Sequence, residues 1–134
     1  MTTILLTALI LTTVTYTLAE GQALTNQSRG PVDLSIQAVN ASAPEGRGIY
    51  TIIGEVFNID TVPFNGVRVS ATLYDNDGQF LVERSAYTSP SGIQPGMNAS
   101  FNINVFGTSI TGGVNAVSNF TLLVAGDRQV LLFQ

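Results

Sequence analysis

Residues 1–19 read MTTILLTALILTTVTYTLA and contain no Lys, Arg, Asp or Glu. Every polar residue in this stretch is Thr, which an apolar helix tolerates because the hydroxyl can bond to a carbonyl one turn earlier. A helix that is apolar on all sides must be buried in a membrane or among other helices. We therefore predict an apolar α-helix over residues 1–29, ended by Gly30 and Pro31.

Two other interpretations of this segment stay open. A secretory signal peptide normally begins with basic residues, and no basic residue precedes Arg29. A β-strand fits the alternation of mostly apolar even-numbered positions with Thr at most odd-numbered ones, and such a strand can complete a neighbour's sheet by donation. The segment is long for a strand, and Leu5, Leu9 and Leu11 interrupt the alternation, so we favour the helix.

The remainder of the chain, from Val32 onward, has the pattern of an all-β sandwich. Short runs of Val, Ile, Phe, Tyr and Thr are separated by Gly, Pro, Asn or Asp. The clearest run is VRVSATLY (67–74), in which every second residue is apolar, as in a half-buried strand. Gly126 and Asp127 separate the last two apolar runs and predict a hairpin turn.

The predicted fold class is α+β, with two regions. A long apolar N-terminal helix occupies residues 1–29, and a seven-stranded immunoglobulin-like β-sandwich occupies residues 30–134. The predicted strands cover residues 33–41, 48–58, 66–75, 79–88, 98–106, 116–125 and 128–134.

Composition argues against an enzyme. The chain has no Cys, His, Trp or Lys, which excludes disulfides, thiol catalysis and histidine general bases. Its five Arg and nine acidic residues give a net charge of −4 without a basic cluster, so we expect no nucleic-acid binding. The run YDNDG (74–78) lacks the remaining ligands of a calcium loop and predicts a hairpin turn. We expect no catalytic, metal or cofactor site.

Four N-x-[ST] sequons favour an extracellular protein carrying N-linked glycans. Their asparagines are Asn26, Asn40, Asn98 and Asn119, and none has Pro at the middle position.

Residues 51–103 resemble the FxLYD-type extracellular domain. The resemblance rests on Gly54-Glu55-Val56 with Asn58, on ATLYD (71–75) followed by Asp77-Gly78, and on Pro95-Gly96 ahead of Phe101. Ala71 stands where the family pattern has Phe. Such domains are small immunoglobulin-like sandwiches on cell surfaces, so the resemblance implies an extracellular location and no catalytic activity.

The arrangement as a whole, a charge-free segment followed by a sandwich with sequons, resembles a mature archaeal type IV pilin. In that family a basic leader is removed ahead of the apolar segment, which becomes the helix at the filament centre. Leu5 stands where bacterial type IV pilins usually carry Glu, a residue that archaeal pilins commonly lack. The resemblance implies a filament-core interface formed by Ile4, Leu5, Leu6, Leu9, Ile10, Leu11, Val14, Tyr16 and Leu18.

These observations lead to one expected function and two alternatives. We expect a structural subunit of an extracellular archaeal type IV pilus for adhesion or surface motility. It would polymerise with itself through the N-terminal helix and sit in the membrane before assembly. The alternatives are a secreted or membrane-anchored immunoglobulin-like binding domain, and a filament subunit of the donor-strand type.

Overall fold

The computed structural model describes residues 3–18, 24–29, 33–43 and 48–133, and the side chains of residues 33–43 and 48–129. Within these ranges the chain forms eight β-strands and two short 3₁₀ helices. The strands are β1 (Thr3–Leu18), β2 (Leu24–Arg29), β3 (Leu34–Ser42), β4 (Ile49–Asn58), β5 (Phe64–Tyr74), β6 (Phe80–Tyr87), β7 (Asn98–Phe106) and β8 (Asn119–Phe133). The 3₁₀ helices are η1 (Gly107–Ser109) and η2 (Val114–Ala116).

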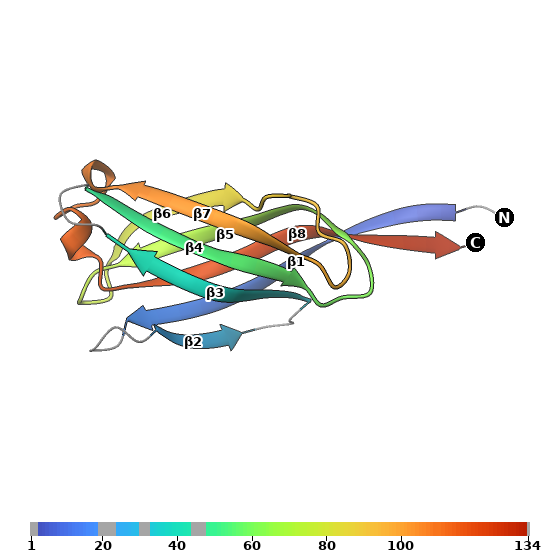
Figure 1. Cartoon of the computed structure of the whole chain (residues 1–134), viewed down its shortest axis with the longest axis horizontal. Helices are drawn as coiled ribbons and strands as arrows, with labels where there is room; N and C mark the ends of the chain where they lie inside the picture. The colour runs from blue at the N-terminus through green and yellow to red at the C-terminus, as the bar shows by residue number, and fades with distance from the viewer. Residues whose placement is uncertain (1–2, 19–23, 30–32, 44–47, 134) are drawn as a thin grey trace.

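The strands form two antiparallel sheets that pack face to face. The larger sheet has the order β2-β1-β8-β5-β6, and the smaller has the order β3-β4-β7. Figure 1 shows the smaller sheet lying across the larger one, with the paired ends of β1 and β8 running past the body. One apolar core fills the space between the sheets and draws residues from both. Its largest fully buried side chains include Phe64, Phe120, Leu34, Ile52 and Leu73.

Period-two alternation decides which face of each central strand is buried. In β5, Val67, Val69, Ala71 and Leu73 are all fully buried, which confirms the face predicted for VRVSATLY. In β7 exposed and buried residues alternate along the whole strand. Apolar residues two apart lie on the same side of a pleated strand, and here that side is the core.

The predicted N-terminal helix is wrong, because residues 3–18 form strand β1 and residues 24–29 form strand β2. The described ranges contain no α-helix. Two physical causes favour the strand. Thr, Ile, Val and Tyr are stiff or crowded in a helix and pack well on a pleated sheet. In addition, β8 offers a long antiparallel partner whose register matches β1 along nearly its whole length.

The predicted hairpin at Gly126 and Asp127 is also wrong, because β8 runs through both residues without a turn. A Cβ at Gly126 would lie 3.0 Å from Val67 Cγ2 and 3.4 Å from Phe64 Cδ1. Glycine at this position therefore serves close packing of β8 against the core. The two predicted strands 116–125 and 128–134 are one strand, so β3 to β8 make six strands where seven were predicted.

The turn predicted at YDNDG is confirmed as the β5–β6 connection. The Asp75 side chain accepts hydrogen bonds from the backbone N–H groups of Asp77 (2.9 Å) and Gln79 (2.8 Å). Gly78 has a φ of 77°, which a glycine adopts without strain. The aspartate thus shapes the turn by accepting hydrogen bonds from the turn backbone with its side chain.

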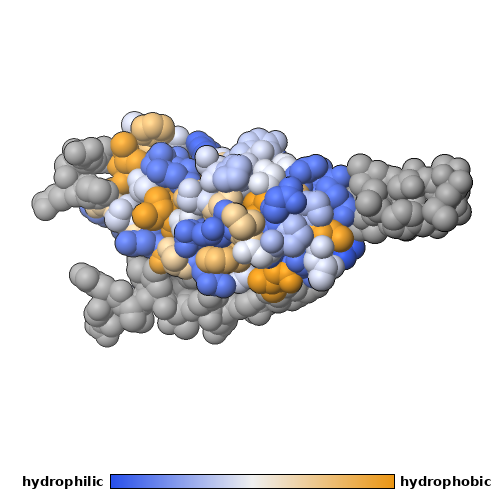
Figure 2. Space-filling model, turned by 45° about the vertical axis from the view of Figure 1, so that its right-hand side comes forward, coloured by the Kyte–Doolittle hydropathy of each residue, from blue (hydrophilic) through white to orange (hydrophobic). Residues whose placement is uncertain are grey.

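Apolar side chains on the described surface are dispersed. The large apolar side chains that are exposed are those of Ile53, Ile59, Phe80, Tyr87, Met97 and Phe106. Figure 2 shows apolar residues on one face as small patches separated by polar ones. Single exposed apolar residues are ordinary for a protein surface, so exposure alone does not define a site here.

Candidate functional site

Strand β1 is the candidate functional element, because it carries no charge and has an unusual place in the sheet. It pairs with β8 from Thr3 opposite Phe133 to Thr17 opposite Asn119. On its other side, β2 pairs only with residues 13–18 of β1. In the sheets, the described β1–β2 hairpin is therefore paired to the remaining strands through β8 alone.

The register aligns the even-numbered positions of β1 with the buried face of β8. Residues directly opposite each other in an antiparallel pair lie on the same face of the sheet. The β8 partners of positions 16, 14 and 12 are Phe120, Leu122 and Val124, and all three are fully buried. The odd-numbered positions, mostly Thr, are aligned with the opposite face. The alternation noted in the sequence thus matches the side of β8 that faces the core.

The far end of the β1–β8 pair has no third strand among the described residues. The last β8 residue that pairs with β5 is Arg128, opposite Phe64. Beyond it, residues 130–133 pair only with residues 3–6 of β1. This two-stranded part has the sequences TILL (3–6) and VLLF (130–133), so it is largely apolar, and among the described residues no further strand pairs with either edge.

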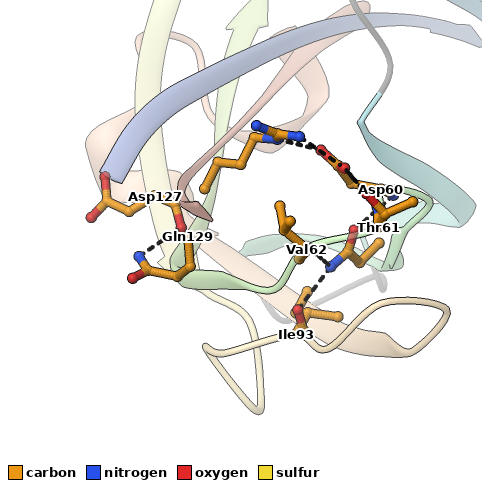
Figure 3. A network of polar contacts seen from close by, with 8 residues as sticks. Asp60, Thr61, Val62, Ile93, Asp127 and Gln129 are labelled. Carbon is orange, nitrogen blue, oxygen red and sulfur yellow. Dashed lines mark hydrogen bonds and ion pairs between the residues drawn. The ribbon is translucent and has the colours of Figure 1, made fainter. Parts of the chain in front are cut away.

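An ion pair braces β8 near the point where β5 begins. The Arg128 guanidinium donates to Asp60 through Nε at 2.6 Å (Oδ2) and through its terminal nitrogen at 3.2 Å (Oδ1), a two-point contact (Figure 3). The Asp60 side chain is only 7% exposed. The hydrogen bond from Arg128 lowers the pKa of the Asp60 carboxyl below its ordinary value, although burial opposes this effect. The pair therefore fixes the 59–63 loop to the strand that carries β1.

Buried Asn58 organises the loop that presents Asp60. Its Nδ2 donates to the carbonyl oxygens of Val62 and Ile93, both at 2.9 Å, and its Oδ1 accepts from the Asp60 N–H at 2.9 Å. Figure 3 shows Val62 and Ile93 beside Asp60 and Thr61 in this network. The Asn58 carbonyl oxygen also accepts from the Gly96 N–H at 2.9 Å. The Asn58 side chain thus joins the end of β4 to the 59–63 loop and to the loop that contains Ile93.

The nine residues predicted as a helical filament core all lie in β1. Their side chains are outside the described part of the structure, so only their place in the strand and its register is known. The predicted burial of an N-terminal helix at a filament axis is wrong, because this segment is a strand. The self-association expected of it stays a prediction.

The four predicted glycosylation sites differ in their surroundings. Asn40 and Asn98 are exposed residues of β3 and β7. Asn98 Nδ2 donates to Glu55 Oε1 at 2.9 Å. Asn119 is partly buried, and its Oδ1 is buried without a hydrogen-bond partner among the described residues. The side chain of Asn26, in β2, lies outside the described residues. Glycosylation stays a prediction, and Asn40 and Asn98 have the most accessible positions.

Sequence reasoning missed the contacts made by Asn58, Asp60 and Arg128. A partial signal existed, because Gly54 and Asn58 belong to the motif that carries the FxLYD resemblance. In the structure Gly54 leaves room for the ring of Phe101, another residue of that motif. The Asp60–Arg128 pair spans 68 positions and has no local signature.

No three acidic side chains among the described residues gather closely enough to hold a metal ion. Within the same part of the chain, no helix has the length and apolar character that crossing a membrane requires. Comparison of the chain with protein-family models, with curated proteins and with solved structures finds no match.

Proposed function

We propose that this chain is a structural subunit of an extracellular filament in which neighbouring copies are joined by exchange of strand β1. The observation that carries the proposal is the pairing of a charge-free strand with the body through β8 alone. Every β1–β8 contact made within one chain is equally available between two chains. An exchanged strand would therefore need no new interface.

The geometry of exchange favours an open polymer. A subunit that gives β1 to one neighbour and receives β1 from another forms a heterologous contact, which extends into a filament unless the rotation closes a ring. Residues 30–32 join β2 to β3, which lies in the other sheet, so the whole β1–β2 hairpin would move as a unit. No charge in β1 would be desolvated by this step, and β1 would pair with a neighbour's β8 in the register that it has with its own.

The extracellular location rests on sequence and is part of the proposal. The four sequons, the absence of Lys, and the resemblance of residues 51–103 to FxLYD-type domains all support it. Within the proposal the two-sheet body is an immunoglobulin-like domain that forms the filament surface. Adhesion would be a property of the assembled surface, without catalysis.

Paired cysteines test the exchange directly, because the chain has no cysteine of its own. Thr15 and Thr121 stand opposite each other in β1 and β8, so replacing both with Cys allows a disulfide across that pair. Exchange predicts a ladder of covalent multimers on a non-reducing gel, together with filaments by negative-stain electron microscopy. A disulfide-bonded monomer alone, at every protein concentration and without filaments, would refute the proposal.

A matched control uses a strand pair that lies inside the body. Thr51 and Asn104 stand opposite each other in β4 and β7 and are joined by a hydrogen bond of 2.9 Å. Replacing both with Cys should give a disulfide-bonded monomer on a denaturing gel, whether or not β1 is exchanged. Multimers from this control would show that the ladder arises from unfolded chains.

A further inference from the structure

A hollow is lined by residues of β3, β4 and β7 in the smaller sheet together with Tyr87 of β6 and Ser89, and it includes an irregularity between β3 and β4. The β3–β4 register shifts between Gln37 and Asn40, and Ala38 in this bulge has a φ of 55°. It is the one described residue other than glycine with a positive φ. Such a backbone costs an alanine about 1 kcal/mol, and strain of this kind tends to gather at binding sites.

Gly54 lines the hollow, and a larger residue does not fit at this position. A Cβ on Gly54 would lie 2.7 Å from Phe101 Cζ and 2.8 Å from Phe101 Cε1. The aromatic ring therefore packs against the bare backbone of β4, directly opposite in the β4–β7 register. Ala38 of the bulge, Gly54 and Phe101 are among the residues that line an open hollow of about 520 Å³. This volume is within the range of small-molecule sites, roughly 300–1,000 Å³.

The lining combines apolar surface with uncharged polar groups. Tyr87 is 63% exposed and Ile53 is 43% exposed, and both border the hollow. Ser89, Ser100 and Asn102 supply hydroxyl and amide groups at the rim. Among the described residues that line the hollow, Glu55 is the one carboxylate, and its Oε1 already accepts a hydrogen bond from Asn98 at 2.9 Å. The same lining includes no arginine, which disfavours an anionic ligand.

We propose that this hollow binds a neutral saccharide, with its apolar face against the ring of Tyr87 and its hydroxyls bonded to Glu55 and Asn102. A sugar ring has C–H groups on its faces and hydroxyls at its rim, which matches an exposed phenol beside a carboxylate, an amide and hydroxyls. The sugar has two possible sources. It is either a separate saccharide or a glycan attached to Asn98, whose Nδ2 lies beside Glu55.

Isothermal titration calorimetry on the full chain tests the proposal. Chain made in bacteria, and therefore without glycans, is titrated separately with chitotriose, mannotriose and maltotriose at millimolar concentrations. We expect saturable binding of at least one, weakened about tenfold by Tyr87→Ala because the aromatic contact is lost. Glu55→Gln should weaken binding several-fold while keeping the shape of the hollow. Phe80→Ala is the matched control, because Phe80 is on the same strand, is 62% exposed and lies outside the hollow.

A second arm separates the two sources. The same titration is repeated with chain from a secretory host that mass spectrometry shows to be glycosylated at Asn98. Binding to the bacterial chain alone would assign the hollow to the attached glycan, and binding to both would assign it to a separate saccharide. The proposal is overturned if the bacterial chain binds none of the three sugars, or if Tyr87→Ala binds as tightly as Phe80→Ala. The test does not depend on strand exchange, because calorimetry reads monomer and filament alike.

Discussion

The Asn58→Ala substitution is expected to be among the most damaging single changes to the body of this protein. Asn58 is 1% exposed, and its side chain makes three hydrogen bonds of 2.9 Å. Two of these are partly buried and contribute about 1 kcal/mol each. The third reaches the Ile93 carbonyl oxygen in a buried position. That oxygen also accepts from the Phe64 N–H at 3.0 Å and keeps this partner in the variant, so the lost bond again contributes about 1 kcal/mol. The free energy of unfolding should fall by about 3 kcal/mol in total, a large share of a typical 5–15 kcal/mol.

Urea denaturation followed by far-UV circular dichroism at 25 °C measures this loss. A loss of about 3 kcal/mol also corresponds to a Tm lower by about 11 °C for a domain of this size. Asn104→Ala is the control, because Asn104 is exposed and accepts one exposed hydrogen bond from Thr51. We expect that variant to lose no more than about 1 kcal/mol. If Asn58→Ala loses no more than the control does, the reasoning that Asn58 ties the two loops together is refuted.

Three further changes test other parts of the structure. The Asp60 carboxyl has a lowered pKa, so its pair with Arg128 stabilises the fold above the ordinary carboxyl pKa and is lost as pH falls through the lowered value. Asp60→Asn should therefore lower the Tm at neutral pH and reduce the loss of Tm on acidification, and a pH profile parallel to wild type would contradict this. Gly54→Ala should cost about 1–3 kcal/mol in urea denaturation, because the added Cβ overlaps the Phe101 ring, and a neutral effect would show that the ring moves freely. Tyr50→Phe should leave the free energy of unfolding unchanged or raise it by up to about 1 kcal/mol, because the buried Tyr50 hydroxyl has no hydrogen-bond partner among the described residues. A clearly lower free energy of unfolding would show that the hydroxyl has a partner.

The pKa of Tyr50 follows from the same burial. Its ring is 4% exposed and packs edge-on against Phe120, with centroids 6.4 Å apart. Burial raises the pKa of Tyr50 to about 12. Spectrophotometric titration should therefore show one tyrosine that ionises only in strongly alkaline solution, and Tyr50→Phe should remove that step.

The strands of the body were predictable because the information that defines them is local. In β5 and β7 the side chains alternate between core and solvent, and the sequence contains that period directly. The turn at Asp75 was predictable for the same reason, since its side chain bonds to the backbone within four residues. The Asp60–Arg128 pair was not, because its partners meet only through the pairing of β5 with β8. A glycine can mark a turn or a place of close packing, and the local sequence does not distinguish the two. At Gly126 the structure shows close packing.

The conformation of residues 3–18 depends on a partner that is more than 100 positions away. Leu5 and Leu11 break the apolar alternation and favoured a helix, yet β8 carries Leu131 and Ala125 directly opposite them. Two of the three interruptions in β1 are thus matched by apolar residues in β8, whereas Leu9 stands opposite Asp127. A segment of this kind takes its structure from the strand beside it, since its own propensities do not decide between helix and strand. The proposal of strand exchange follows the same logic, because β8 of a second copy offers β1 the same sequence, in the same register, as β8 of its own chain.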